Sequence, residues 1–456
     1  MNTTNSKFST HVNFVPSPNS RGTLSILWSS LFTILACTWT VQHLNVPEQR
    51  NSCKPGWMGT LTWYTRKFLK SARWMIVTSI APEVVIGMAC YDLVTANITL
   101  RSLEKIALED GVPWTLTHSY FANMGGFVIE SGVEKPSAVS TYISMADVEV
   151  RSTSQAGPNL RNRREKRHEI RRQPLTNHLP SFVTGGVNEI SYHNPYHLTG
   201  RQICQLRKEG ILPRLPHISE AELTDRSKSD GFVKAIAFSQ ILWDIIQIIV
   251  RAARKLPISQ LELAVIAFAV CAMIMYGLNW SKPKNIGAVT AVIQYEGPIP
   301  QGVLTLIQGW HSYLGYILIA DDRGRRRHGS PIRNDSTQDD PHDYWNLLAI
   351  LLGAPVFGGI HVAAWNFGFP TKIDLIIWRV TSLYSAACSP LLLFGGCLVQ
   401  GVHNKDDRVL YTFLSTVMVL YIIARVALLV EIFRTLFFLP PLAYVSTWTK
   451  DIPHFG

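Results

Sequence analysis

Four polar side chains recur at helical spacing inside one apolar stretch of the chain. Gln240, Asp244, Gln247 and Arg251 are separated by 4, 3 and 4 residues, in a segment otherwise rich in Ile, Leu and Val. This spacing places all four on one face of an α-helix. Because an unpaired polar group is costly inside a membrane, the stripe indicates either a helix–helix contact or a polar site.

Further ionisable residues lie in other apolar segments of the chain. If successive segments cross a membrane in alternating directions, Glu262, His361, Arg379 and Arg425 lie at a depth similar to that of Asp244. Arginine stays charged in proteins and therefore needs a partner when it is buried. We expect Asp244 and Glu262 to pair with Arg379 and Arg425. Together with His361, these residues would form one buried network.

Three roles for this network remain open. The charges can lock helices together, they can line a hydrated cavity for a ligand or ion, or they can form a catalytic centre. In the catalytic case, the acid–base candidates are His361, Asp244 and Glu262. The expected members of a ligand-binding or structural network are Arg379, Arg425, Gln240, Gln247 and Glu83.

The composition indicates what kind of element positions these residues. Only 16% of the 456 residues are charged, whereas AVILMFWYC make up 47%. About seven apolar stretches are each long enough to cross a bilayer as a helix. These features exclude an ordinary cytosolic enzyme, a disordered protein and a small disulfide scaffold. The expected fold is an all-α polytopic membrane protein with about seven transmembrane helices, or six.

The alternation of apolar and polar segments predicts the order of the parts. The expected spans are 23–43, 74–95, 232–252, 258–280, 345–366, 372–398 and 409–432. The parts are a polar tail (1–22), two spans with a basic connecting loop (23–95), a large polar loop with a disordered Arg-rich insertion (96–231), a membrane helix pair (232–280), a polar loop (281–344), a three-helix membrane segment (345–432) and a C-terminal tail (433–456).

The second span decides the topology. Pro82 and Glu83 sit at the centre of 74–95, where each weakens a spanning helix. With seven spans, the basic loop 44–73 and the turn 253–257 share one side, which should be cytoplasmic. If the segment around Pro82 only lies in the interface, six spans result. Residues 44–231 and 281–344 then share the cytoplasmic side.

Two local patterns predict packing detail. Ser219 and Glu222 have capping-box spacing, which predicts an amphipathic helix that continues into the third span. Gly358 and Gly359, just before His361, allow a neighbouring helix to approach closely. The packing of His361 against that neighbour is an alternative to a role as base or ligand.

The charge balance bounds the partners. Lys and Arg number 43 against 32 Asp and Glu, for a net charge of +11. On a membrane protein this excess reflects topology and membrane lipid rather than nucleic acid. We expect membrane lipid as a partner, a lipophilic small molecule if a ligand is bound, and no nucleic acid. Protein partners are undefined by the sequence.

No motif calls for a cofactor. The cysteines show no CxxC pair or Cys/His spacing for a metal, and no HExxH or phosphate-binding loop occurs. Neither a metal site nor a cofactor is therefore expected. Asn2, Asn97 and Asn334 lie in N-x-S/T sequons and are candidate glycosylation sites.

Several longer strings also carry a family resemblance. They are RGTLSILWSSLFTILACTWTVQHLNVP (21–47), HSYFANMGGF (118–127), ISEAELTDRSKSDGFVKA (218–235), LPISQLELAVIAFAVCAMIMYGLNWSKP (256–283), HVAAWNFGFPT (361–371) and IPHF (452–455). With them the chain resembles a large family of multi-span integral membrane proteins of filamentous fungi. The resemblance supplies no catalytic residues and implies, at most, an accessory role in fungal secondary metabolism.

Three functions are carried forward. The first is a non-enzymatic membrane protein, such as a scaffold, sensor or small-molecule handler. The second is a membrane-embedded enzyme or carrier that acts on a lipophilic small molecule through the buried network. The third is a receptor-like seven-span sensor.

Overall fold

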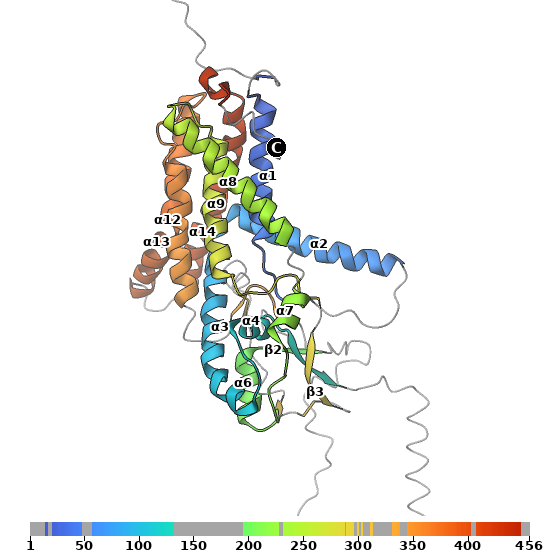
Figure 1. Ribbon diagram of the computed structural model, residues 1–456. Coiled ribbons are helices and arrows are strands. Elements are labelled where there is room, and N and C mark those ends of the chain that lie inside the picture. Colours follow the sequence, from blue (N-terminus) through green and yellow to red (C-terminus); the bar gives the residue numbers. More distant parts are fainter. Residues whose placement is uncertain are drawn as a thin grey trace, which may run out of the picture.

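The computed structural model describes most of the chain outside its longest polar segments. The described residues are 14–16, 21–47, 57–131, 195–227, 231–287, 289–295, 299–300, 302–303, 311–312, 331–337, 344–402 and 407–447. Within these ranges the chain is mostly helical, with a few short strands. It forms a helical bundle with a small mixed module at one end (Figure 1).

The helices fall into two groups by place. The upright and oblique helices of the bundle are α1 (Thr23–Thr40), α2 (Trp57–Ile80), α3 (Pro82–Asp110), α8 (Gly231–Ala253), α9 (Gln260–Leu278), α12 (Tyr344–Val362), α13 (Lys372–Val402) and α14 (Asp407–Leu436). Those of the module are α4 (Leu116–Asn123), α6 (Gly200–Lys208) and α7 (Glu220–Arg226). In Figure 1, α8 crosses the bundle obliquely and α2 projects away from it.

Five helices are long and apolar enough to cross a membrane. They are α1, α3, α9, α13 and α14. The apolar part of α12, Leu348–Val362, is shorter than a span, and α8, with its polar stripe, is not among the five. The helical membrane class is therefore supported by length and composition, whereas the expected count of about seven is not confirmed.

The expected second span, 74–95, is wrong in position. The chain forms α2 up to Ile80 and begins α3 at Pro82, with Ala81 between them at φ −138° and ψ 68°. Proline has no N–H to continue the helical ladder, and its ring excludes the helical conformation at the preceding residue. Half of the expected basic loop 44–73 is also helical, as the first part of α2.

The segment 96–231, expected as a polar loop, contains a folded module. Strand β1 (Phe127–Ser131) pairs antiparallel with β2 (Tyr196–Leu198) and parallel with β3 (Thr290–Tyr295). A second, two-residue pair joins β4 (His311–Ser312) and β5 (Ser336–Thr337). The Arg-rich insertion predicted as disordered lies outside the described residues.

A hydrophobic core holds the module together. Its fully buried side chains come from α3, α4 and the sheet, and include Leu103, Phe121, Phe127 and Leu198. Ser219 accepts a hydrogen bond from the Glu222 N–H, which confirms the helix cap. The helix ends at Arg226, however, and α8 begins separately at Gly231.

A continuous helix and two polar contacts connect the module to the bundle. Helix α3 is unbroken from the bundle interior at Pro82 to the module at Asp110. The Tyr120 hydroxyl donates to the Leu278 carbonyl at the end of α9 over 2.8 Å. Asp92 on α3 forms an ion pair of 2.6 Å with Lys282, just beyond α9.

The opposite end of the bundle brings together the segments just before α1 and just after α14. The Arg21 N–H, before α1, donates to the Tyr444 carbonyl over 3.2 Å. The Gln260 side chain, at the start of α9, donates to the Gly368 carbonyl between α12 and α13. Helices α1 and α9 therefore run toward the module, and α14 runs away from it.

Gly358 allows α12 and α13 to approach closely. A Cβ built on Gly358 of α12 would lie 2.4 Å from the Ala386 backbone nitrogen of α13, whereas one on Gly359 would meet nothing within 4 Å. The expected close approach is thus confirmed for Gly358 alone.

Candidate functional site

The break between α2 and α3 leaves backbone groups exposed inside the bundle. Because Pro82 cannot donate, the last carbonyls of α2 lose their helical partners. Tyr421 and Arg425, in the middle third of α14, replace them. The Arg425 Nε donates to the Ile80 carbonyl over 2.6 Å, and the Tyr421 hydroxyl approaches the same oxygen at 3.3 Å.

Glu83 lies on the other side of the break. It is in the first turn of α3, and its carboxylate accepts a hydrogen bond from the Tyr421 hydroxyl. It also interacts electrostatically with Arg425. The cation thus lies at the C-terminus of α2 and the anion at the N-terminus of α3, which is the favourable sign at each helix dipole.

Close packing keeps this carboxylate in place. A Cβ on Gly353 of α12 would lie 3.1 Å from the Glu83 Cβ, so a larger residue there would press on Glu83. Glu83, Tyr421 and Arg425 are all buried. The arrangement can share a proton between a carboxyl and a phenol, but every group already has a protein partner.

His361, on α12, lies beside Glu83, Tyr421 and Arg425 and is linked to Arg425 through Phe357. Its Nδ1 donates to the Phe357 carbonyl over 2.9 Å, and its ring centroid lies 4.8 Å from that of Phe357 and 5.9 Å from that of Trp378. The Arg425 guanidinium carbon lies 4.0 Å from the Phe357 ring centroid. We call Glu83, His361, Tyr421 and Arg425 the break cluster.

Asp244 lies in a separate polar group between α8 and α1. Its carboxylate accepts hydrogen bonds from the Thr33 hydroxyl and, at 3.2 Å, from the Ser29 hydroxyl. Gln240, one turn earlier, also interacts with it. Gln247, one turn later, is half-buried. Neutral donors thus satisfy this carboxylate.

Arg251, the last member of the stripe, holds the chain end. It donates to the Pro257 carbonyl over 2.8 Å, to the Ala443 carbonyl over 2.8 Å and to the Val445 carbonyl over 3.1 Å. The stripe on α8 therefore serves two different neighbours, α1 at its centre and the C-terminal segment at its end.

Glu262 belongs to that same end of the bundle. It forms an ion pair with Arg21 and accepts hydrogen bonds from the Ser259 N–H and hydroxyl, which completes a capping box at the start of α9. Together these contacts clamp the segment before α1 and the segment after α14 to the α8–α9 turn.

The expected single network is therefore wrong among the described residues. Arg425 bonds to a carbonyl at the break and interacts with Glu83, not with Asp244 or Glu262. Arg379 is only half-buried; it donates to the Trp365 carbonyl over 3.0 Å and lies 4.7 Å from that ring. Each arginine donates to a backbone carbonyl that a helix end leaves without a helical partner. The spacing of residues along the helices does not predict such contacts.

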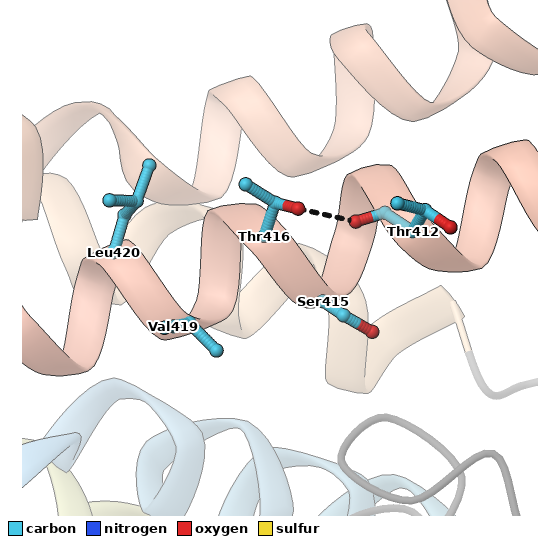
Figure 2. Close-up of a pocket in the computed structure, with 5 residues that line it drawn as sticks. All are labelled: Thr412, Ser415, Thr416, Val419 and Leu420. Carbon is cyan, nitrogen blue, oxygen red and sulfur yellow. Dashed lines mark hydrogen bonds between the residues drawn. The ribbon is translucent and has the colours of Figure 1, made fainter.

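A hollow of about 480 Å³ lies on the outside of α14. Thr412, Ser415, Thr416, Val419 and Leu420 line it (Figure 2). The Thr416 hydroxyl donates to the Thr412 carbonyl, and the Thr412 hydroxyl to that of Arg408. Since these hydroxyls are used within the helix and the hollow is open, it offers little to fix a ligand.

No cluster of His, Cys, Asp and Glu able to hold a metal occurs in the part of the chain that the structure describes. Of the sequons, Asn2 lies outside the described residues. Asn97 is within α3 and donates to the Leu93 carbonyl, and the Asn334 Nδ2 is buried. Both side chains are poorly placed to accept a glycan, which attaches at exposed loops.

The sequence reasoning missed Tyr421, a member of the break cluster, and Phe357, whose ring packs against Arg425 and His361. Neither carries a charge, so neither stands out in an apolar segment. The usable signal was the Pro82–Glu83 pair, because a proline inside an apolar run predicts freed carbonyls that need donors.

Comparison with known proteins gives one match. A family model described as "Family of unknown function (DUF8562)" matches residues 1–171 and 185–307. No curated protein and no solved structure matches the chain.

Proposed function

The chain belongs to this family of unknown function. Because family membership indicates no activity, we propose a function from the geometry of the structure. The protein is a multi-pass membrane scaffold with a non-enzymatic role, which holds a folded polar module at one membrane face. One observation carries this: each buried charge described above is bonded within the protein. Glu83, Glu262, Arg251 and Arg425 are bonded at helix ends, caps and the break, and Asp244 joins α8 to α1, so these charges fix the fold.

The module supplies the second part of the argument. A mobile loop would not need α3 to continue unbroken from the bundle, nor the ion pair between Asp92 and Lys282. These links hold the module in one orientation to the membrane. A scaffold needs such a fixed presentation, whereas a catalyst would need an opening toward its buried acid–base groups.

We further propose six crossings, by α1, α8, α9, α12, α13 and α14. The α2–α3 unit then enters the bundle from the module side and returns to it. The basic residues Arg66, Lys67, Lys70 and Arg73 of α2 lie on that side, which favours a cytoplasmic module. The segments around Arg21 and Tyr444, at the bundle end opposite the module, then face away from the cytoplasm.

A second candidate is a carrier or enzyme for a lipophilic small molecule, centred on the break cluster. The observation that favours it is the interrupted helix at Ala81, since irregular backbone at membrane depth is typical of transport sites. The resemblance to fungal membrane proteins is compatible with an accessory role in secondary metabolism for either candidate, the scaffold or the carrier or enzyme. A receptor-like sensor with seven spans has least support, because the proposed six crossings place the segments before α1 and after α14 on the same side of the membrane.

The test is deletion of the gene followed by an untargeted comparison of extracted small molecules. Wild type and the variants Glu83→Gln, His361→Ala and Asp244→Asn are then returned at matched protein levels, with Arg379→Ala as the half-exposed control. The scaffold predicts that each of these four bundle variants, provided that it folds, restores the wild-type profile.

One result would distinguish the carrier or enzyme from the scaffold. A metabolite that wild type and Arg379→Ala restore, but that well-folded Glu83→Gln and His361→Ala do not, would contradict the scaffold and support the carrier or enzyme. A variant of the exposed module surface that folds but fails to restore the profile would support the scaffold.

A further inference from the structure

Helix α2 has an apolar face that the described parts of the protein leave mostly exposed. Trp57, Leu61, Tyr64 and Phe68 follow one another at spacings of 4, 3 and 4, which places them on one side of the helix. Their exposed fractions are 76%, 59%, 60% and 59%. Four large side chains at this exposure form a continuous apolar strip, too large for an ordinary water-facing surface.

A basic face lies on another side of the same helix. Arg66, Lys70 and Arg73 recur at spacings of 4 and 3, and Arg66 and Arg73 are exposed. With Lys67, the helix carries four positive charges, and no Asp or Glu occurs between Glu48 and Glu83. Four charges in 24 residues exclude α2 as a spanning helix, but the pattern is that of a helix lying in a membrane interface.

The place of α2 in the fold agrees with this orientation. Its C-terminus is anchored in the bundle at the break, and the helix projects outward from there (Figure 1). The Phe68 ring lies 5.9 Å from that of Trp39, on α1. Exposed Trp28, Phe32 and Leu35 continue the apolar surface along α1. The strip on α2 is therefore continuous with a surface that lipid would cover.

We propose that α2 lies in the leaflet on the module side and binds anionic lipid headgroups. The apolar strip enters the acyl boundary, and the exposed Arg66 and Arg73 meet lipid phosphates and carboxylates. The proposal rests on membrane insertion of the bundle, as proposed above. The charge of α2 favours a lipid surface as the partner. Its charged residues are all basic and its apolar strip is continuous, so the helix matches an anionic membrane interface along its whole length.

The first measurement locates the two faces. The full chain is reconstituted in nanodiscs of phosphatidylcholine with and without phosphatidylserine, in a background with Cys53 and Cys397 changed to Ser. Fluorophores are attached to Leu61→Cys, Phe68→Cys and Arg66→Cys. Nitroxide-bearing lipid should quench the first two several-fold more than the third, and a water-soluble quencher should show the reverse order.

A probe on Leu383→Cys, exposed on α13, keeps the two proposals apart. If lipid fails to quench it, membrane insertion of the bundle is wrong. If it is quenched while Leu61→Cys is reached only from water, the inference about α2 is wrong. Shielding of Leu61→Cys from both quenchers would show that a second copy or another protein covers the strip, which also overturns it.

The second measurement tests the lipid class. Native mass spectrometry compares phosphatidylserine retained by wild type, by Arg66→Gln/Arg73→Gln and by the control Arg101→Gln/Lys105→Gln, whose residues are exposed near the module. The α2 variant should retain about tenfold less, and the control should match wild type. Equal loss in both, or no loss in either, would overturn the proposed headgroup contact.

Discussion

The bundle and the module sort the same kinds of side chain in opposite ways. The module buries Leu103, Phe127 and Leu198 completely. The bundle leaves large apolar side chains such as Phe394 and Ile423 on its outside and places Glu83 and Arg425 within. Helix α3 passes from one pattern into the other. The difference indicates two solvents along one molecule, lipid around the bundle and water around the module.

The two regions also use charge differently. In the module, Arg207 forms a bidentate pair with Asp110, at 2.7 and 3.1 Å, and the Leu215 N–H donates to the same carboxylate. In the bundle, Arg425 and Arg251 donate mainly to backbone carbonyls. Where water cannot reach the backbone, a broken helix needs a side chain to replace the missing donor.

The largest effect should come from Arg425→Leu. This change leaves the Ile80 carbonyl without its main donor and Glu83 without its cation, which should cost about 4 kcal/mol of stability. Thermal unfolding of the purified protein in detergent measures it. The control is Arg379→Leu, whose half-exposed position predicts a much smaller change. Equal losses in both variants would contradict the assigned role of the break.

Next in size is Leu103→Ala in the module core. Removing a fully buried leucine should destabilise the module by about 3 kcal/mol. Leu108, on the same helix but 78% exposed, gives the matched control Leu108→Ala. Amide hydrogen exchange separates the regions: protection should fall around β1 and α4 while α13 and α14 stay protected. A uniform loss would mean that the bundle and the module unfold as one unit.

A smaller effect is expected at Gly358 of α12. Gly358→Ala places a Cβ against the Ala386 backbone and should cost about 2 kcal/mol through forced separation of α12 and α13. Gly359→Ala meets nothing and should leave the melting temperature nearly unchanged. Reversal of this order would show that α13 packs elsewhere.

The smallest effect is a pH dependence confined to the module. Burial lowers the pKa of His118, which the hydrogen bond to the Ile218 carbonyl only partly offsets. The unfolded histidine takes up a proton near its usual pKa of about 6.5 while the folded one stays neutral. Module stability should therefore fall as the pH drops through that value and be constant above it.

Hydrogen exchange at pH 7 and pH 5 measures this dependence. In His118→Gln the difference between the two pH values should shrink, because the titrating group is gone. In the control His217→Gln, which changes an exposed neighbour, the acid sensitivity should persist. An unchanged difference in His118→Gln would show that other groups produce it.

The sequence predicted elements better than contacts. The helical, membrane-suited class and the Ser219 cap follow from local patterns, and the structure agrees with both. The pairing of Arg379 and Arg425 with Asp244 and Glu262 did not follow, because depth along a helix does not specify its facing neighbour. The module was missed because its core residues come from segments separated in the chain, each too short to show periodicity.

The parallel pairing of β1 with β3 has a consequence for how the protein is made. Strand β3 leaves the ribosome only after α8 and α9. In the six-crossing topology proposed above, most of the module is therefore synthesised before α8 and α9 insert and the chain returns to pair β3 with β1. Since domains generally begin to fold during synthesis, the sheet cannot be completed until that insertion has succeeded. A completed sheet would therefore form only in chains whose α8 and α9 have inserted correctly.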